Sequence, residues 1–178
     1  ADSVRLTFPE GTTAIAIARK MEEAGLCSAE DFLKEANEGD FSAYTFWQYV
    51  PEDKDAPDRF MKCEGYLFPD TYEFFVGENA SSVVKKFLSN GDSKISEKDR
   101  AQAKKLGYSM YEVMTIASII QKEAGSEKQM KTITSVIHNR LSDKTNFPSL
   151  GCQSTSDYIT NFVKPNLSST SAHTADYY

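Results

Sequence analysis

Signals that start and stop helices recur along this chain, and they constrain its fold more than any other feature. Ser28, Ser96 and Ser109 each precede an acidic residue by three positions, a pattern typical of side chains that cap a helix start. Gly107 and Gly125 follow at positions suited to helix ends. The predicted helices cover residues 13–25, 28–36, 80–89, 96–106, 109–124 and 126–141, with a short one near 157–162.

Two segments have the composition of extended chain instead. Residues 4–8 alternate apolar and polar side chains, which predicts a strand. Residues 64–76 are rich in aromatic and β-forming residues and are interrupted by Pro69 and Asp70, so we expect two short strands or extended segments joined by a turn at that dipeptide. The charged, proline-bounded residues 51–57 indicate a loop. Together these patterns predict an α+β fold, with a helix-rich core and a short β region.

Composition narrows the class of protein and of partner. The chain has 178 residues, 40% of them hydrophobic and 26% charged, which suffices for one sizeable core. The net charge of −6 argues against nucleic acid or anionic lipid as a main partner. The spacing of Cys27, Cys63 and Cys152 fits no zinc pattern, and His138 and His173 lie far apart in sequence. We therefore expect no metal and no cofactor. One disulfide among the three cysteines is the alternative to three free thiols.

Glu123 is a carboxylate on a helix face that should bury hydrocarbon. Isoleucines precede it by three, four and seven positions, so the four side chains share one face of the predicted helix. Such surroundings favour the protonated carboxyl group, as a general acid requires. The alternative is a solvated glutamate near a helix end, paired with Lys122 or Lys128. The stripe predicted to face the core consists of Val113, Ile116, Ala117, Ile120 and Ala124.

Three blocks of this sequence together resemble one family. Residues 117–123 (ASIIQKE) are similar to the signature helix of the YceG-like endolytic murein transglycosylases. Residues 64–72 (EGYLFPDTY) resemble the family's other hallmark, and residues 136–141 (VIHNRL) the helix that follows the signature helix. The opening residues 9–13 (PEGTT) also fit. The resemblance spans most of the chain, in the family's order.

The resemblance implies an enzyme that cuts peptidoglycan glycan strands internally. A lytic transglycosylase cleaves the bond between N-acetylmuramic acid and N-acetylglucosamine, leaves 1,6-anhydro ends and terminates strand elongation. One carboxylate suffices, because the C6 hydroxyl of the muramic acid residue attacks its own C1. Glu123 matches that catalytic residue. The implied partners are glycan strands and cell-wall synthases. The implied location is the extracytoplasmic face of the cell membrane, with the membrane anchor absent from this chain.

The family pattern also suggests a division of the chain. Residues 1–50 are expected to form a small N-terminal strand–helix subdomain, and residues 58–178 a catalytic domain that is truncated at its C-terminal end. Trp47 lies in an aromatic run before the expected linker. It has two interpretations, a hydrophobic contact that seals two subdomains or a surface on which a sugar stacks.

Further residues are candidates for binding the glycan, each with an alternative. Asn139 and Arg140 offer donors to acetamido or lactyl groups, although Arg140 also suits a structural ion pair. Tyr66, Phe68 and Tyr72 alternate, so they could form a sugar platform or pack in the core. The predicted substrate-binding residues are Glu64, Tyr66, Phe68, Asp70, Gln121, Asn139, Arg140 and Gln153.

Two competing functions follow from particular residues. If the reaction were hydrolytic, as in a muramidase, Glu64 and Asp70 would be the candidate second carboxylates. Otherwise Glu64 braces a turn, and Asp70 makes a local hydrogen bond from its side chain to the main chain. Gln121 stands where the family usually has an acidic residue, and Gln153 where an aspartate is common. These departures favour the alternative of a catalytically impaired module that binds peptidoglycan or acts as a scaffold.

Overall fold

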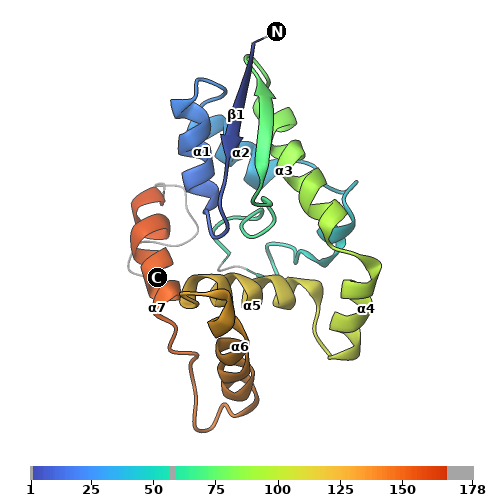
Figure 1. Ribbon diagram of the computed structural model, residues 1–178, viewed down its shortest axis with the longest axis vertical. Helices are drawn as coiled ribbons and strands as arrows, with labels where there is room; N and C mark the ends of the chain where they lie inside the picture. The colour runs from blue at the N-terminus through green and yellow to red at the C-terminus, as the bar shows by residue number, and fades with distance from the viewer. Residues whose placement is uncertain (1, 57–58, 168–178) are drawn as a thin grey trace. The chain divides into compact units, whose positions relative to one another are not determined.

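The computed structural model describes residues 2–56 and 59–167 of the chain and confirms the α+β class. Within these residues the sheet is two-stranded and the remaining elements are helices (Figure 1). The chain divides into two compact units, residues 1–114 and 115–178. The division falls inside one helix, α5, which spans Met110–Glu123.

The first unit is built on an antiparallel strand pair. Strand β1 (Ser3–Thr7) pairs with β2 (Thr71–Phe75), so that Ser3 lies opposite Phe75 and Thr7 opposite Thr71. The division into residues 1–50 and 58–178 stays a prediction, and each of these parts contributes one strand to the sheet. The reason is that a lone strand at residues 3–7 satisfies its backbone groups only by pairing.

Three helices pack around this sheet and enclose an aromatic core (Figure 1). They are α1 (Ala14–Glu23), α2 (Ala29–Glu38) and α3 (Ala80–Lys94). The ring of Phe87 on α3 lies 5.0 Å from that of Phe8 and 5.8 Å from that of Phe74, measured between centroids. All three phenylalanines are buried. Burial of such large side chains is the main source of stability for this unit.

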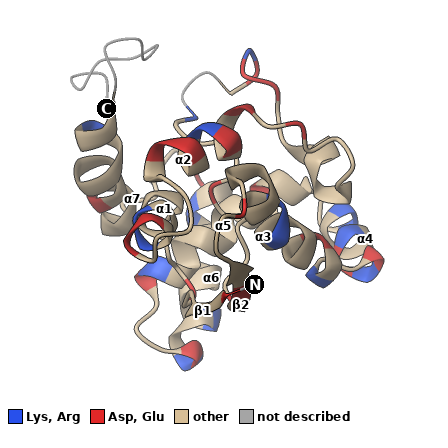
Figure 2. Ribbon diagram, turned by 90° about the horizontal axis from the view of Figure 1, so that it is seen from above, with Lys and Arg blue, Asp and Glu red and all other residues tan. Residues whose placement is uncertain are grey.

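Local capping sets where the helices begin. The Thr13 side chain accepts a hydrogen bond from the Ala16 amide at the start of α1, and Ser28 accepts one from the Asp31 amide at the start of α2. Helix α4 (Glu97–Lys105) has the full capping box of Ser96 with Asp99. Its first turn is acidic and its last turn basic, which complements the helix dipole (Figure 2). The predicted starts are confirmed.

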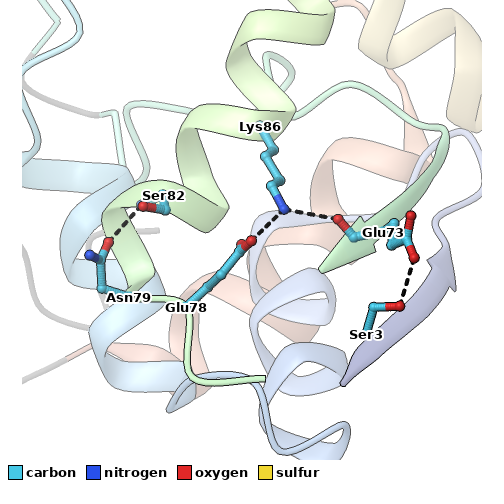
Figure 3. Close-up of polar contacts among 6 residues, drawn as sticks. All are labelled: Ser3, Glu73, Glu78, Asn79, Ser82 and Lys86. Carbon is cyan, nitrogen blue, oxygen red and sulfur yellow. Dashed lines mark hydrogen bonds and ion pairs between the residues drawn. The ribbon is translucent and has the colours of Figure 1, made fainter. Parts of the chain in front are cut away.

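A lysine joins the second strand to the third helix. Lys86 donates to the Glu73 main-chain oxygen of β2 at 2.9 Å and to Glu78 Oε1 at 2.6 Å (Figure 3). The Asn79 side chain caps the start of α3, and Ser3 donates to Glu73 Oε1 at 2.6 Å (Figure 3). These bonds fix the edge of β2 against α3, because the Glu73 carbonyl would otherwise be an unpaired group on a sheet edge.

Two extended segments were predicted within residues 64–76, and the prediction of the first one is wrong. Residues 64–67 form a turn, in which the Tyr66 amide donates to the Cys63 carbonyl at 2.9 Å. Gly65 has φ +86°, a left-handed conformation that glycine adopts without strain and that ends an extended run. Tyr66 therefore does not share a strand face with Tyr72. Residues 51–56 form neither helix nor strand, as expected of a loop, whereas Pro57 lies outside the described residues.

Trp47 belongs to the core side of the first unit. It lies in the short 3-10 helix η1 (Thr45–Tyr49), and its ring lies 5.1 Å from Phe41 and 6.1 Å from Phe46 in edge-on contacts. It is half-buried against the aromatic core. These contacts favour a packing role for Trp47 over a sugar-stacking one.

The second unit is helical. It contains the end of α5, then α6 (Glu127–Ser142) and α7 (Gln153–Tyr158), which continues through η2 (Ile159–Val163) and η3 (Lys164–Asn166). Ile137 of α6 and Val163 of η2 are buried. Helical structure near residues 157–162 was predicted, but it starts earlier than expected. In the described part of the chain, no helix combines the length and the apolar character needed to cross a membrane.

The apolar stripe of α5 is less buried than predicted. Met110 is the buried residue of this helix, whereas Ile116 and Ile120 are half-buried and Ala117 is exposed. The stripe was expected to be buried in the core, and its residues are less buried than that expectation.

Candidate active site

Glu123 is the last residue of α5, and one of its oxygens is held by the main chain of a distant helix. Oε1 accepts a hydrogen bond of 2.8 Å from the Ser154 amide. Ser154 is the second residue of α7, and the N-cap residue of that helix, Cys152, makes no side-chain capping bond. Glu123 thus supplies the acceptor that α7 lacks locally. The carboxylate is half-buried.

The loop before α7 is held by an arginine of α6. Arg140 Nη1 donates to the Leu150 carbonyl, and the guanidinium carbon lies 5.7 Å from the ring centroid of Phe147. Gly151, the next residue, has φ +60°, and a Cβ atom there would lie 3.3 Å from Arg140 Nη1. Backbone freedom and space therefore both favour glycine at this position.

The Cys152 thiol is influenced by the charges of both Glu123 and Arg140. Burial raises the pKa of the Cys152 thiol, the Glu123 carboxylate raises it further, and the Arg140 guanidinium lowers it. The thiol is half-buried, with its sulfur 3.8 Å from the Leu150 carbonyl oxygen. The pKa of the Cys152 thiol therefore depends on the charges of both Glu123 and Arg140.

The turn between α5 and α6 fixes the C-terminal end of α5. The Ala124 amide closes the last turn of α5 on the Ile120 carbonyl at 3.0 Å. The Gly125 amide then donates to Gln129 Oε1 of α6 at 2.9 Å. Both bonds lie next to Glu123, so its backbone is anchored from two helices.

The remaining candidates of the second unit divide into two groups. Arg140 of α6 contacts the loop before α7, and Gln153 is the first residue of α7. Gln153 is exposed, and its Nε2 donates to Asp157 Oδ1 at 2.8 Å. Asn139 is exposed, and its main-chain oxygen accepts from the Ser142 hydroxyl at 2.9 Å. Gln121 is half-buried on α5. Within the described residues Glu123 is hydrogen-bonded to the Ser154 amide and not to Asn139 or Gln121, so the substrate roles of those two residues stay predictions.

In the first unit, two of the candidates serve the packing of α1 and the core. The Ala14 amide donates to Glu64 at the start of α1, with distances of 3.0 Å to Oε1 and 3.3 Å to Oε2. Tyr66 is 5% exposed, and its ring stacks on Phe46 with centroids 4.7 Å apart. Glu64 thus braces the start of α1, a structural role that differs from the expected bracing of its own turn. The contacts of Tyr66 favour the packing interpretation.

Asp70 and Phe68 join a polar cluster beside β2. Asn90 Nδ2 donates at 3.0 Å to both Asp70 Oδ2 and the Tyr72 hydroxyl, and that hydroxyl donates to the Phe68 carbonyl at 2.6 Å. The hydrogen bond from Asn90 lowers the pKa of Asp70, as does the one from the Thr71 amide. Asp70 therefore makes the local bond to the main chain that one interpretation expects. The Phe68 ring is half-buried.

Sequence reasoning missed one member of the site, the Ser154 amide. A main-chain donor has no signature in residue type, so pattern reasoning had no means of assigning it. Within the described residues no group of three or more His, Cys, Asp or Glu is placed to hold a metal ion.

Comparison with known proteins identifies the family to which the chain is similar. The model of the YceG-like family matches residues 1–178. An endolytic murein transglycosylase of Streptococcus pneumoniae (serotype 2, strain D39) is 30% identical over 147 residues, which are 76% of this chain and 26% of that protein. One from Bacillus subtilis (strain 168) is 33% identical over 81 residues, 46% of this chain and 22% of that protein.

A solved structure supports the fold as well. The crystal structure of a YceG-like protein from Listeria monocytogenes superposes with a TM-score of 0.76 at 28% identity, covering 95% of this chain and 56% of the other. The chain spans about a quarter of the length of the Streptococcus pneumoniae relative, at 26%. Because the family model covers the whole sequence, this chain belongs to the YceG-like family.

Proposed function

We propose that this chain carries the catalytic site of an endolytic peptidoglycan lytic transglycosylase. The curated relatives are named endolytic murein transglycosylases, and Glu123 ends the helix that carries the family resemblance. The observation that carries the proposal is the hydrogen bond of 2.8 Å from the Ser154 amide to Glu123 Oε1. It fixes the orientation of the carboxyl group and leaves Oε2 as the oxygen that carries the proton.

The reaction needs one proton donor that becomes a base. Glu123 Oε2 gives its proton to the glycosidic oxygen of the departing N-acetylglucosamine, and the bond from that oxygen to C1 of the muramic acid residue breaks. The C6 hydroxyl of the same residue attacks C1, and its proton passes to the Glu123 carboxylate. A 1,6-anhydro end forms, no water is consumed, and Glu123 is protonated again.

A single carboxylate fits this chemistry better than it fits hydrolysis. Intramolecular attack has a high effective molarity, so the protein need not provide a nucleophile. A muramidase would use a second carboxylate, and the candidates were Glu64 and Asp70. Both are engaged elsewhere, Glu64 with the Ala14 amide and Asp70 with Asn90 and the Thr71 amide. This engagement favours the lyase over the muramidase.

The biological role that we propose follows from cleavage of glycan strands at internal bonds. Internal cleavage terminates the elongation of a glycan strand, so the enzyme would act where strands are made. Peptidoglycan lies outside the cytoplasmic membrane, which gives the extracytoplasmic face as the site of action. Cell-wall synthases are the corresponding partners.

The test is Glu123→Gln on purified peptidoglycan, with products analysed by mass spectrometry. The glutamine oxygen can still accept from Ser154, so the fold should persist while the release of anhydro ends falls on the order of 10²–10⁴-fold. Glu127→Gln, at an exposed position in the first turn of α6, is the matched control and should keep wild-type activity.

Three outcomes would overturn the proposal. Wild-type rates in the Glu123→Gln variant would exclude Glu123 as the acid. Products heavier by one water molecule would identify a muramidase. Binding of strands by the wild-type chain without any cleavage would identify the impaired binding or scaffolding module that Gln121 and Gln153 favour.

A further inference from the structure

Arg140 is attached to the loop before α7 by two different contacts. Its Nη1 donates to the Leu150 carbonyl, and its guanidinium lies over the ring of Phe147, 5.7 Å from the centroid. The Arg140 side chain is half-buried. Arg140 lies in the last turn of α6, which ends two residues later at Ser142. A guanidinium engaged through both an N–H group and its flat face has little freedom to follow a substrate.

The loop that Arg140 holds leads directly to the amide that holds Glu123. Only Gly151, Cys152 and Gln153 separate Leu150 from Ser154. Gly151 has φ +60°, so the turn between the two anchored points has a specific backbone conformation. A shift of the Leu150 carbonyl would therefore be passed to the Ser154 amide over a short, conformationally restricted segment.

We infer that Arg140 is a positioning residue for Glu123 and acts through residues 150–154. The expected effect of Arg140 on the reaction rate rests on the proposed function. Its expected effect on the position of the Ser154 amide rests on geometry alone. The assignment differs from the expectation that Arg140 contacts acetamido or lactyl groups of the glycan. A contact to the glycan would contribute to substrate affinity, whereas a positioning role contributes to the rate of the chemical step.

Two substitutions of Arg140 separate these roles. Arg140→Met keeps most of the length of the side chain and removes every donor. Arg140→Lys restores one positively charged donor that can reach the Leu150 carbonyl. The matched control is Arg100→Met in the first unit, since Arg100 Nη1 also donates to a main-chain carbonyl, that of Ile95, at 2.7 Å. Arg100→Met removes a hydrogen bond of the same type from the first unit, which does not contain Glu123.

The first measurement is hydrogen exchange of the Ser154 amide by NMR, which needs no activity. Glu123→Ala removes the acceptor and sets the scale for complete loss of this bond. In Arg140→Met we expect the amide to exchange roughly five- to tenfold faster, in Arg140→Lys an intermediate rate, and in Arg100→Met the wild-type rate. Unchanged exchange in Arg140→Met would overturn the inference.

The second measurement is steady-state cleavage of glycan strands. Loss of positioning should lower kcat about 10- to 100-fold in Arg140→Met with KM within about twofold, and the lysine variant should recover part of kcat. A raised KM with unchanged kcat and unchanged Ser154 exchange would identify a substrate contact and overturn the inference. If the wild-type chain releases no anhydro ends, the proposed function fails, while the exchange experiment still decides whether Arg140 positions Ser154.

Discussion

The bracing role of Glu64 makes a prediction whose magnitude follows from the geometry of α1. Both carboxylate oxygens lie within hydrogen-bonding distance of the Ala14 amide, at 3.0 Å and 3.3 Å, and Ala14 is fully buried. Thr13 caps a different amide, that of Ala16. Glu64 thus satisfies a first-turn donor that has no intrahelical partner, and it places a negative charge at the helix N-terminus.

Removal of the whole side chain should cost more than removal of its charge. Glu64→Ala loses a capping bond of about 1 kcal/mol and a charge–dipole interaction of roughly 0.3–1 kcal/mol, so the first unit should lose about 1.5–2 kcal/mol. Glu64→Gln keeps an acceptor and should lose about 0.5 kcal/mol. For a unit of this size, about 4 °C per kcal/mol gives a decrease in Tm of roughly 6–8 °C and 2 °C respectively.

The fluorescence of Trp47 provides the assay, because it is the one tryptophan of the chain and lies in the first unit. Thermal unfolding followed at this signal reports the unit that contains Glu64. Glu10→Ala, at an exposed carboxylate in the turn before α1, is the control and should leave Tm unchanged. If Glu64→Ala unfolded at the wild-type temperature while its kcat/KM fell, Glu64 would be a substrate ligand and the bracing argument would be wrong.

Two further predictions concern the loop before α7. Alkylation of Cys152 by iodoacetamide at pH 8, followed by mass spectrometry, should be faster in Glu123→Gln than in the wild-type chain, because loss of the negative charge lowers the thiol pKa. Equal rates in the two proteins would contradict the influence of Glu123 on this thiol. Gly151→Ala should destabilise the second unit by about 1 kcal/mol, since φ is +60° and the new methyl group would crowd Arg140, whereas Gly151→Asn should cost less; calorimetry of both variants tests the order.

The helix starts could be predicted because capping is a local interaction. Ser96 with Asp99 and Ser109 with Glu112 make their reciprocal bonds within three residues, so the sequence contains both partners. The starts of α1, α2 and α4 follow from the same logic. The α+β class and a strand near residues 4–8 followed from local alternation of apolar and polar residues, whereas the pairing of β1 with β2 was not predicted.

Helix ends and burial depended on distant contacts. The helix predicted for residues 80–89 continues to Lys94, through Gly91. A Cβ atom at Gly91 would lie 3.0 Å from the Tyr66 carbonyl oxygen and 3.5 Å from Phe68 Cβ, so glycine is present there because the turn at residues 64–68 packs closely against α3. A glycine required for close packing resembles a glycine that ends a helix, and sequence alone does not separate the two.

The missing side-chain cap at the start of α7 indicates a contact with a residue distant in the sequence. The acidic candidate Glu123 was recognisable because a carboxylate follows an isoleucine-rich helix face, but its partner lies 31 residues later in the main chain. Cys152, at the N-cap of α7, has no strong capping group, although Ser, Thr, Asp or Asn is preferred there. A helix that lacks its own cap needs an acceptor from elsewhere, and a carboxylate is the acceptor best suited to a helix N-terminus. The weak cap of α7 and the carboxylate at the end of α5 are therefore two halves of one arrangement, and a strong local cap at residue 152 would compete with Glu123 for the Ser154 amide.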